Sequence, residues 1–185
     1  MYIILMSIPT KEDILINTGL VTFDKDYADR YHAQAMQYNI GEYMDVLAVI
    51  YSLKPLAALN IMHKNYVKNS GVDEVKKMVK EYGLRRFTKV RNHKTHYLNT
   101  VYFHPDNIEN AKKLMAILWC NVVDESHKEY MIGKLLGYNE DSLVAFYMRN
   151  YGVKLTNVDI KSMNDELDQM VIRQILLDQH DIRLF

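Results

Sequence analysis

The sequence contains very little cysteine, glycine and proline. Its single cysteine, Cys120, rules out an intrachain disulfide, a zinc finger with paired cysteines and a CxxC redox site. Cys120 follows the apolar Leu118-Trp119, which favours a buried small side chain over a nucleophile. Seven glycines and three prolines in 185 residues indicate long helices. The cysteine usage predicts a reducing, cytoplasmic location, inside a host cell if the protein is viral.

The sequence also lacks a long hydrophobic run and an excess of either charge. Its most apolar region, 43–53, contains Asp45 and stops at Lys54-Pro55, short of the roughly 20 residues that a membrane helix needs. Residues 1–8 have neither a basic flank nor a cleavage site, so neither a secretory signal nor membrane association is expected. Twenty-three basic residues balance 23 acidic ones, which excludes a uniformly basic nucleic-acid coat and an acidic mimic of DNA.

The remaining composition is that of a globular protein, with 49% hydrophobic and 25% charged residues. No internal repeat and no Gly/Ser/Pro-rich linker divides the chain. We therefore expect one predominantly helical α+β domain over 1–185, with a mixed half at 1–105 and a helical half at 106–185. The many Tyr, Met, Lys, Asn and Ile residues resemble the usage of AT-rich genomes, including those of large phages, so a viral origin is one hypothesis.

In the first half, short β-rich segments and apolar helical periods alternate. The Pro9-Thr10-Lys11 turn signal separates two expected strands, and Gly83 closes an expected helix. Enrichment in Thr, Val, Tyr and Phe on both sides of 91–94 predicts a central hairpin. The expected strands are 2–8, 13–18, 84–90 and 95–103, and the expected helices are 24–37, 41–53, 55–67 and 72–82.

In the second half, every expected element is a helix with a recognisable start or stop. Asp106 with Glu109 resembles a capping box, and a further helix, 124–136, ends before Gly137. Asn139 caps the next helix, which Gly152 ends, and Thr156 with Asp159 begins the last one. Together these helices predict a C-terminal bundle.

Charge is concentrated in one short segment. Residues 76–96 carry eight basic residues and one acidic residue, Glu81, which gives a net charge of +7. The segments 1–75, 97–155 and 156–185 carry −3, −1 and −3. Cations this close repel one another unless solvent or an anionic partner screens them. The segment is either a solvated basic face or a site for an anion.

Aromatic residues alternate with these cations, namely Tyr82, Phe87 and Tyr97. Nucleic-acid sites combine cations that follow the phosphates with rings that accept unstacked bases. Arginine forks on phosphate oxygens would hold a nucleotide by the same chemistry. We therefore expect an anionic partner, either nucleic acid or a nucleotide, on a basic helix and hairpin. The expected ligand-binding residues are Lys76, Lys77, Lys80, Arg85, Arg86, Phe87, Lys89, Arg91, His93, Lys94 and Tyr97.

An enzymatic alternative uses His93 and His96 in the string His93-Lys94-Thr95-His96. The H-x-T triplet resembles that of two-histidine phosphoesterases, but no other histidine supplies the second triplet that those enzymes need. The alternative is a phosphodiesterase or nuclease with His93 and His96 as acid and base.

No metal site or cofactor is expected. The acids at 24–29 lack the glycine and terminal glutamate of a calcium loop, and those at 124–129 lie where acids favour a helix start. No phosphate-binding glycine loop is present either.

A third hypothesis is a viral inhibitor or interaction module whose basic face binds an acidic host protein. The last helix, expected over 156–180, carries a near-heptad stripe that would suit a homodimer seam, formed by Ile160, Met163, Leu167, Val171 and Ile175. The leading hypothesis remains a non-enzymatic binding protein with an anionic partner.

Overall fold

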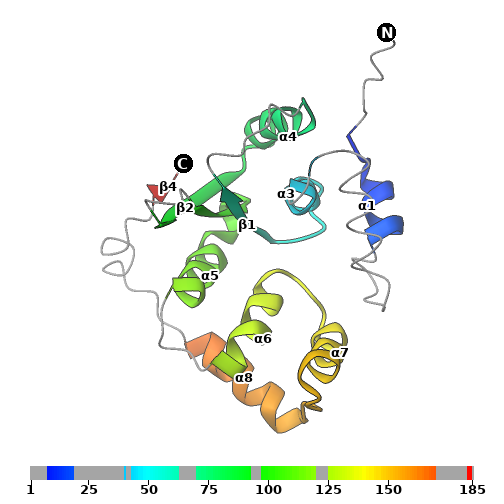
Figure 1. The fold of residues 1–185 in the computed structure, drawn as a ribbon, viewed down its shortest axis with the longest axis vertical. Helices are drawn as coiled ribbons and strands as arrows, with labels where there is room; N and C mark the ends of the chain where they lie inside the picture. Colours follow the sequence, from blue (N-terminus) through cyan, green and yellow to red (C-terminus); the bar gives the residue numbers. More distant parts are fainter. Residues whose placement is uncertain are drawn as a thin grey trace.

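The computed structural model confirms the predominantly helical α+β fold (Figure 1). The structure describes residues 8–18, 40, 43–62, 70–92, 97–119, 125–169 and 183–184. The elements of the first half are α1 (Lys11–Thr18), α3 (Tyr43–Ile50), β1 (Leu56–Met62), α4 (Ser70–Glu81), β2 (Arg85–Asn92) and β3 (Tyr97–Phe103). The short 3-10 helix η1 (Pro105–Asn107) then leads into α5 (Ile108–Trp119), α6 (Glu125–Leu135), α7 (Glu140–Tyr151), α8 (Asn157–Gln169) and β4 (Arg183–Leu184).

One antiparallel sheet with the strand order β1-β3-β2-β4 organises the first half. The central strand β3 pairs with β1 from Phe103 opposite Leu56 to Tyr97 opposite Met62. It also pairs with β2, which confirms the predicted hairpin, and the register shifts between Val90 and Asn92. The two residues of β4 extend the sheet on the outer side of β2.

Each face of the sheet covers a separate part of the core. Ala57, Leu59 and Tyr102 pack with α3 and α4 on one face. Val101 and Phe103 pack with α5 on the other, and Figure 1 shows these helices on opposite sides of the sheet. Because successive side chains of a strand point to opposite faces, β1 and β3 are buried on both sides.

Two predictions for the first half are wrong. The strand expected at 13–18 lies in α1, which Thr10 and Asp13 begin: the Asp13 amide donates to the Thr10 hydroxyl at 3.2 Å, and the Asp13 carboxylate accepts from the Thr10 amide at 2.9 Å. Of the helix expected at 55–67, residues 56–62 instead form β1, because a strand buried on both faces has the same continuous apolar run as a buried helix. Residues 63–67 lie outside the described part of the chain. The expected strand 2–8, except for Ile8, and the expected helix 24–37 lie outside the described residues.

The predicted helix boundaries at Gly137, Asn139, Gly152 and Thr156 are confirmed. The predicted cap Asp106 instead lies inside η1, before α5 begins at Ile108. The expected end of the last helix at 180 lies outside the described residues. The Asn139 side chain accepts a hydrogen bond from the Ser142 amide at 2.8 Å, and Gly152, at φ +66°, ends α7. The Asp159 carboxylate accepts from the Thr156 amide at 2.8 Å and from its hydroxyl at 2.7 Å. These two hydrogen bonds lower the pKa of Asp159.

The apolar stripe of α8 packs within the chain where the structure describes it. Met163 is buried with Tyr130 and Tyr147, and Leu167 is buried with residues of α5 and α6. These two side chains therefore stabilise the monomer, and the homodimer through 156–180 stays a prediction.

The α3–β1 connection contacts the α6–α7 turn and so joins the two halves. The Lys54 ammonium, on a side chain that is only 3% exposed, lies 2.7 Å from the Asp45 carboxylate. It also donates to the Tyr138 hydroxyl at 3.4 Å and lies 4.8 Å from the centre of the Tyr138 ring. Next to it, Gly137 has a φ of +92°, and a Cβ there would lie 2.5 Å from Cδ of Pro55. Only glycine permits this approach.

Ser52 ends α3 in a left-handed conformation, with a φ of +58°. The Leu53 amide donates to the Ala48 carbonyl at 2.8 Å, and the Ser52 amide donates to the Val49 carbonyl at 2.9 Å. This pair of bonds is the Schellman arrangement, in which glycine normally occupies the Ser52 position. A residue with a Cβ is strained in that region.

We therefore expect Ser52→Gly to stabilise the protein by roughly 0.5–1 kcal/mol, since relief of the strain outweighs the added entropy of the unfolded chain. Urea unfolding measures this change. The matched control is Ser162→Gly, in the exposed interior of α8, which we expect to destabilise by about 0.5 kcal/mol. Equal losses in both variants would contradict the strain at Ser52.

Candidate anion-binding surface

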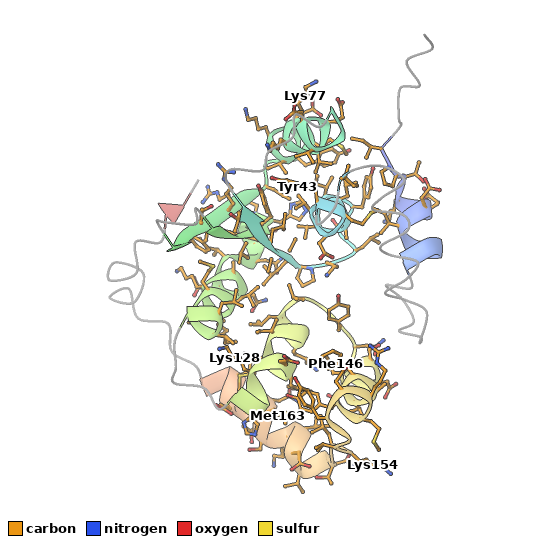
Figure 2. All side chains as sticks on the ribbon, viewed as in Figure 1. Tyr43, Lys77, Lys128, Phe146, Lys154 and Met163 are labelled. Carbon is orange, nitrogen blue, oxygen red and sulfur yellow. The ribbon has the colours of Figure 1, made fainter. Side chains whose placement is uncertain are left out.

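The predicted basic segment forms the C-terminal half of α4 and the strand β2, and we call this surface the basic helix–hairpin. The inner side of α4 buries Val72 and Val75 against α3. Lys77 and Lys80 are exposed, and Figure 2 shows Lys77 on the outer side of α4, away from the sheet. A short turn through Tyr82 then leads into Arg85 at the start of β2.

Carboxylates one turn earlier partly balance two of the lysines of α4. The Lys76 ammonium lies 3.9 Å from the Asp73 carboxylate, and that of Lys77 lies 3.5 Å from Glu74. Exposed pairs of this kind contribute only about 0–1 kcal/mol, so an anionic partner can compete with them. Lys80 forms no ion pair with any other described residue.

Two buried tyrosines lie between Lys76 of α4 and Arg86 of β2. The Lys76 ammonium lies 5.9 Å from the centre of the Tyr43 ring, and this ring lies 6.4 Å from that of Tyr102. The Arg86 guanidinium donates to the Tyr102 hydroxyl at 3.5 Å. The fold thus brings the two cations to one side of the sheet. Arg85, the neighbour of Arg86, lies on the opposite face because the strand alternates.

The two aromatic residues within the segment have opposite environments. Phe87 is 4% exposed, and its ring centre lies 4.9 Å from that of Phe103, so this expected ligand-binding residue lies in the core under α5. Tyr82 is 52% exposed, in the turn between the lysines of α4 and the arginines of β2. Sequence reasoning noted Tyr82 but did not select it. Tyr82 continues the apolar period of α4, four residues after Met78, so periodicity alone predicts a buried ring. Its place after the last turn of α4, next to Gly83, is the only sequence signal of exposure.

The other expected residues are placed by backbone alone or not at all. Lys89 pairs with Asn99, Arg91 lies where the β2–β3 register shifts, and Tyr97 pairs with Asn92. The turn residues 93–96, which include His93, Lys94 and His96, lie outside the described residues. The prediction that His93 and His96 act as acid and base therefore stays a prediction.

A further basic residue lies beside this segment. In β4, Arg183 pairs with Thr88 of β2. Arg183 is far from the segment in sequence, so no local charge count could place it next to β2.

A cavity of about 670 Å³ lies beside the contact between the two halves and is lined by Ser52, Lys54, His104 and Asp106, among others. The Lys54 ammonium is already paired with Asp45, and Nε2 of His104 lies 2.9 Å from the Val49 carbonyl oxygen. These polar groups hold the fold together, so the cavity is a weaker candidate site than the basic helix–hairpin.

The described residues contain neither a cluster of metal ligands nor a helix that could span a membrane. No group of three or more His, Cys, Asp or Glu side chains lies close enough together there to hold a metal ion. In the same part of the chain, no helix has the length and apolar character needed to cross a membrane.

Comparison of the chain with protein-family models, with curated proteins and with solved structures finds no match. A functional assignment therefore depends on the geometry and charge described above.

We expect the two aromatic residues to differ sharply in their effect on stability. Phe87→Ala removes a buried ring and is expected to cost about 3–5 kcal/mol, whereas Tyr82→Ala is expected to change the free energy of unfolding by no more than about 0.5 kcal/mol. Urea unfolding of both variants measures the difference. A large loss of stability in Tyr82→Ala would show that its ring is a structural contact and would remove it from the surface.

Proposed function

We propose that this is a non-enzymatic binding protein that holds an anionic partner, single-stranded nucleic acid in the first place, on the basic helix–hairpin. The observation that carries the proposal is Tyr82, an exposed aromatic ring that the sequence places between the exposed cations Lys80 and Arg85. A ring on a surface is costly in water and useful to a ligand that can stack on it.

The chemistry of single strands fits this arrangement. Lysine and arginine side chains neutralise phosphates and release counterions, and an aromatic ring accepts a base that has no stacking partner in a duplex. Four exposed cations, Lys77, Lys80, Arg85 and Arg86, lie within five residues of Tyr82 in the sequence. A nucleotide would use the same groups but fewer of the cations, so a polymer makes better use of the +7 segment.

Removal of two cations tests the electrostatic part of the proposal. We expect Lys80→Gln/Arg85→Gln to weaken binding to a fluorescent single-stranded oligonucleotide by roughly tenfold at low salt. The slope of log affinity against log salt falls by about 1.4, since each lost phosphate contact removes about 0.7. Fluorescence anisotropy at several salt concentrations measures both values.

The matched control is Lys154→Gln/Lys161→Gln, which removes the same charge from exposed positions in the helical half. Figure 2 shows Lys154 at the end of the molecule opposite Lys77. The control is expected to leave the affinity and the slope unchanged. Equal weakening in both double variants would mean that only net charge matters. Absence of binding to single-stranded DNA, duplex DNA and RNA at low salt would refute the proposed function.

Replacement of the ring tests the stacking part separately. Tyr82→Leu is expected to weaken single-strand binding roughly fivefold at every salt concentration, because stacking does not release counterions. Duplex binding by the same variant is expected to stay unchanged. A variant that weakens duplex and single-strand binding equally would contradict a role for Tyr82 in stacking.

A further inference from the structure

A second concave region lies between α6, α7 and α8, far from the basic helix–hairpin. This cavity of about 540 Å³, which we call the α7–α8 cavity, has an apolar floor that includes Leu155 and Met163. The ring of the buried Tyr147 and that of the exposed Tyr151 also line it, with ring centres 5.3 Å apart. Figure 2 shows Met163 and Phe146 among the side chains that fill the space between these helices. A cavity of this size and composition suits a small ligand.

The polar groups of the α7–α8 cavity favour positive charge. Glu129 and Asp159 line it, and no lysine or arginine does so among the described residues. The third polar group, His127, holds Nδ1 at 2.6 Å from the Glu166 carboxylate, so a further acid stands directly behind the imidazole. These carboxylates would repel an anion and attract a cation.

Tyr151 carries its ring at the opening of the cavity in a fixed protonation state. The Glu129 carboxylate beside its hydroxyl raises the pKa of Tyr151 to about 12. The neutral phenol keeps an electron-rich ring face beside a carboxylate at all ordinary pH values. This combination of ring and carboxylate is the usual recognition chemistry for organic cations.

The opening of the cavity is also unusually apolar for a surface. Tyr151 is 53% exposed and Val153 is 49% exposed. Of the five exposed large hydrophobic side chains among the described residues, these two line the cavity. This observation is independent of the charges, and it indicates that a ligand with an apolar part covers the rim.

We propose that the α7–α8 cavity binds an organic cation, an amine or a guanidinium on a short aliphatic stem. The stem lies on the floor formed by Leu155 and Met163, and the cationic head lies between the Tyr151 ring and the carboxylates of Glu129 and Asp159. The ligand is either a free small amine or the side chain of an arginine or lysine. This site is opposite in charge to the basic helix–hairpin and does not depend on the function proposed there.

Titration of the labelled protein by two-dimensional amide NMR tests the site with three probes at matched ionic strength. Agmatine represents a free small cation, acetyl-arginine methylamide represents a protein side chain, and acetyl-citrulline methylamide is its neutral counterpart. We expect the cationic probes to shift amides of α6, α7 and α8 and the citrulline probe to leave them unchanged. Tighter binding of agmatine assigns the site to a free amine, and tighter binding of the arginine probe assigns it to a protein side chain.

Glu129→Gln is expected to weaken binding of the cationic probes roughly fivefold, since it removes the charge and keeps the shape. The control Asp165→Asn, on the exposed side of α8, removes the same charge outside the cavity and is expected to bind as the wild type does. The spectra also show whether each variant is folded. No shift with either cation, an equal response to citrulline, or equal weakening by Asp165→Asn would overturn the proposal.

Discussion

One buried cation reinforces the apolar join between the sheet half and the helical half. Lys54 places its ammonium between the Asp45 carboxylate of α3 and the Tyr138 hydroxyl of the α6–α7 turn. Removal of an ammonium from water costs several kcal/mol, so this arrangement persists only while both partners stay in place. The approach of Pro55 to Gly137 fixes the same two segments at the neighbouring residue. These two contacts fix the α3–β1 connection against the α6–α7 turn, beside the apolar core in which α5 and α6 pack on the sheet.

Positive and negative charge are concentrated in different halves of the molecule. The sequence is neutral in total, yet its basic helix–hairpin and its acid-lined α7–α8 cavity belong to different halves of the molecule. Figure 2 shows Lys77 of one half and Met163 of the other near opposite ends. At this separation the two regions do not neutralise each other, because charges farther apart than a Debye length are largely screened.

Local signals predicted much of this structure. The ends of α7 and the start of α8 depend on hydrogen bonds between near neighbours in sequence, so they can be predicted from Asn139, Gly152 and the pair Thr156 and Asp159. The hairpin was predictable because Thr, Val, Tyr and Phe are enriched on both sides of its turn. The strand β1 was not, since burial on both faces removes the alternation that marks a strand. Thr10 and Asp13 have the spacing of a helix cap, but the apolar residues after them led to the prediction of a strand where α1 lies.

Features that depend on distant contacts could not be predicted. The burial of Lys54 requires Tyr138, and the sequence gives no sign that these residues meet. The basic helix–hairpin was predictable as a cluster of charge, but the assignment of its rings was not. Phe87 and Tyr82 both lie among cations in sequence, and only the packing of β2 on α5 makes one a core residue and leaves the other exposed.

Amide hydrogen exchange of the wild type and of Lys54→Met tests the role of Lys54 most directly. The substitution keeps much of the side-chain volume and removes the charge that Asp45 and Tyr138 hold. If this cation joins the two halves, protection falls in α3 and β1 on one side and in α6 and α7 on the other, by comparable amounts. Loss of protection confined to α3 and β1, with α6 and α7 as protected as in the wild type, would contradict the account.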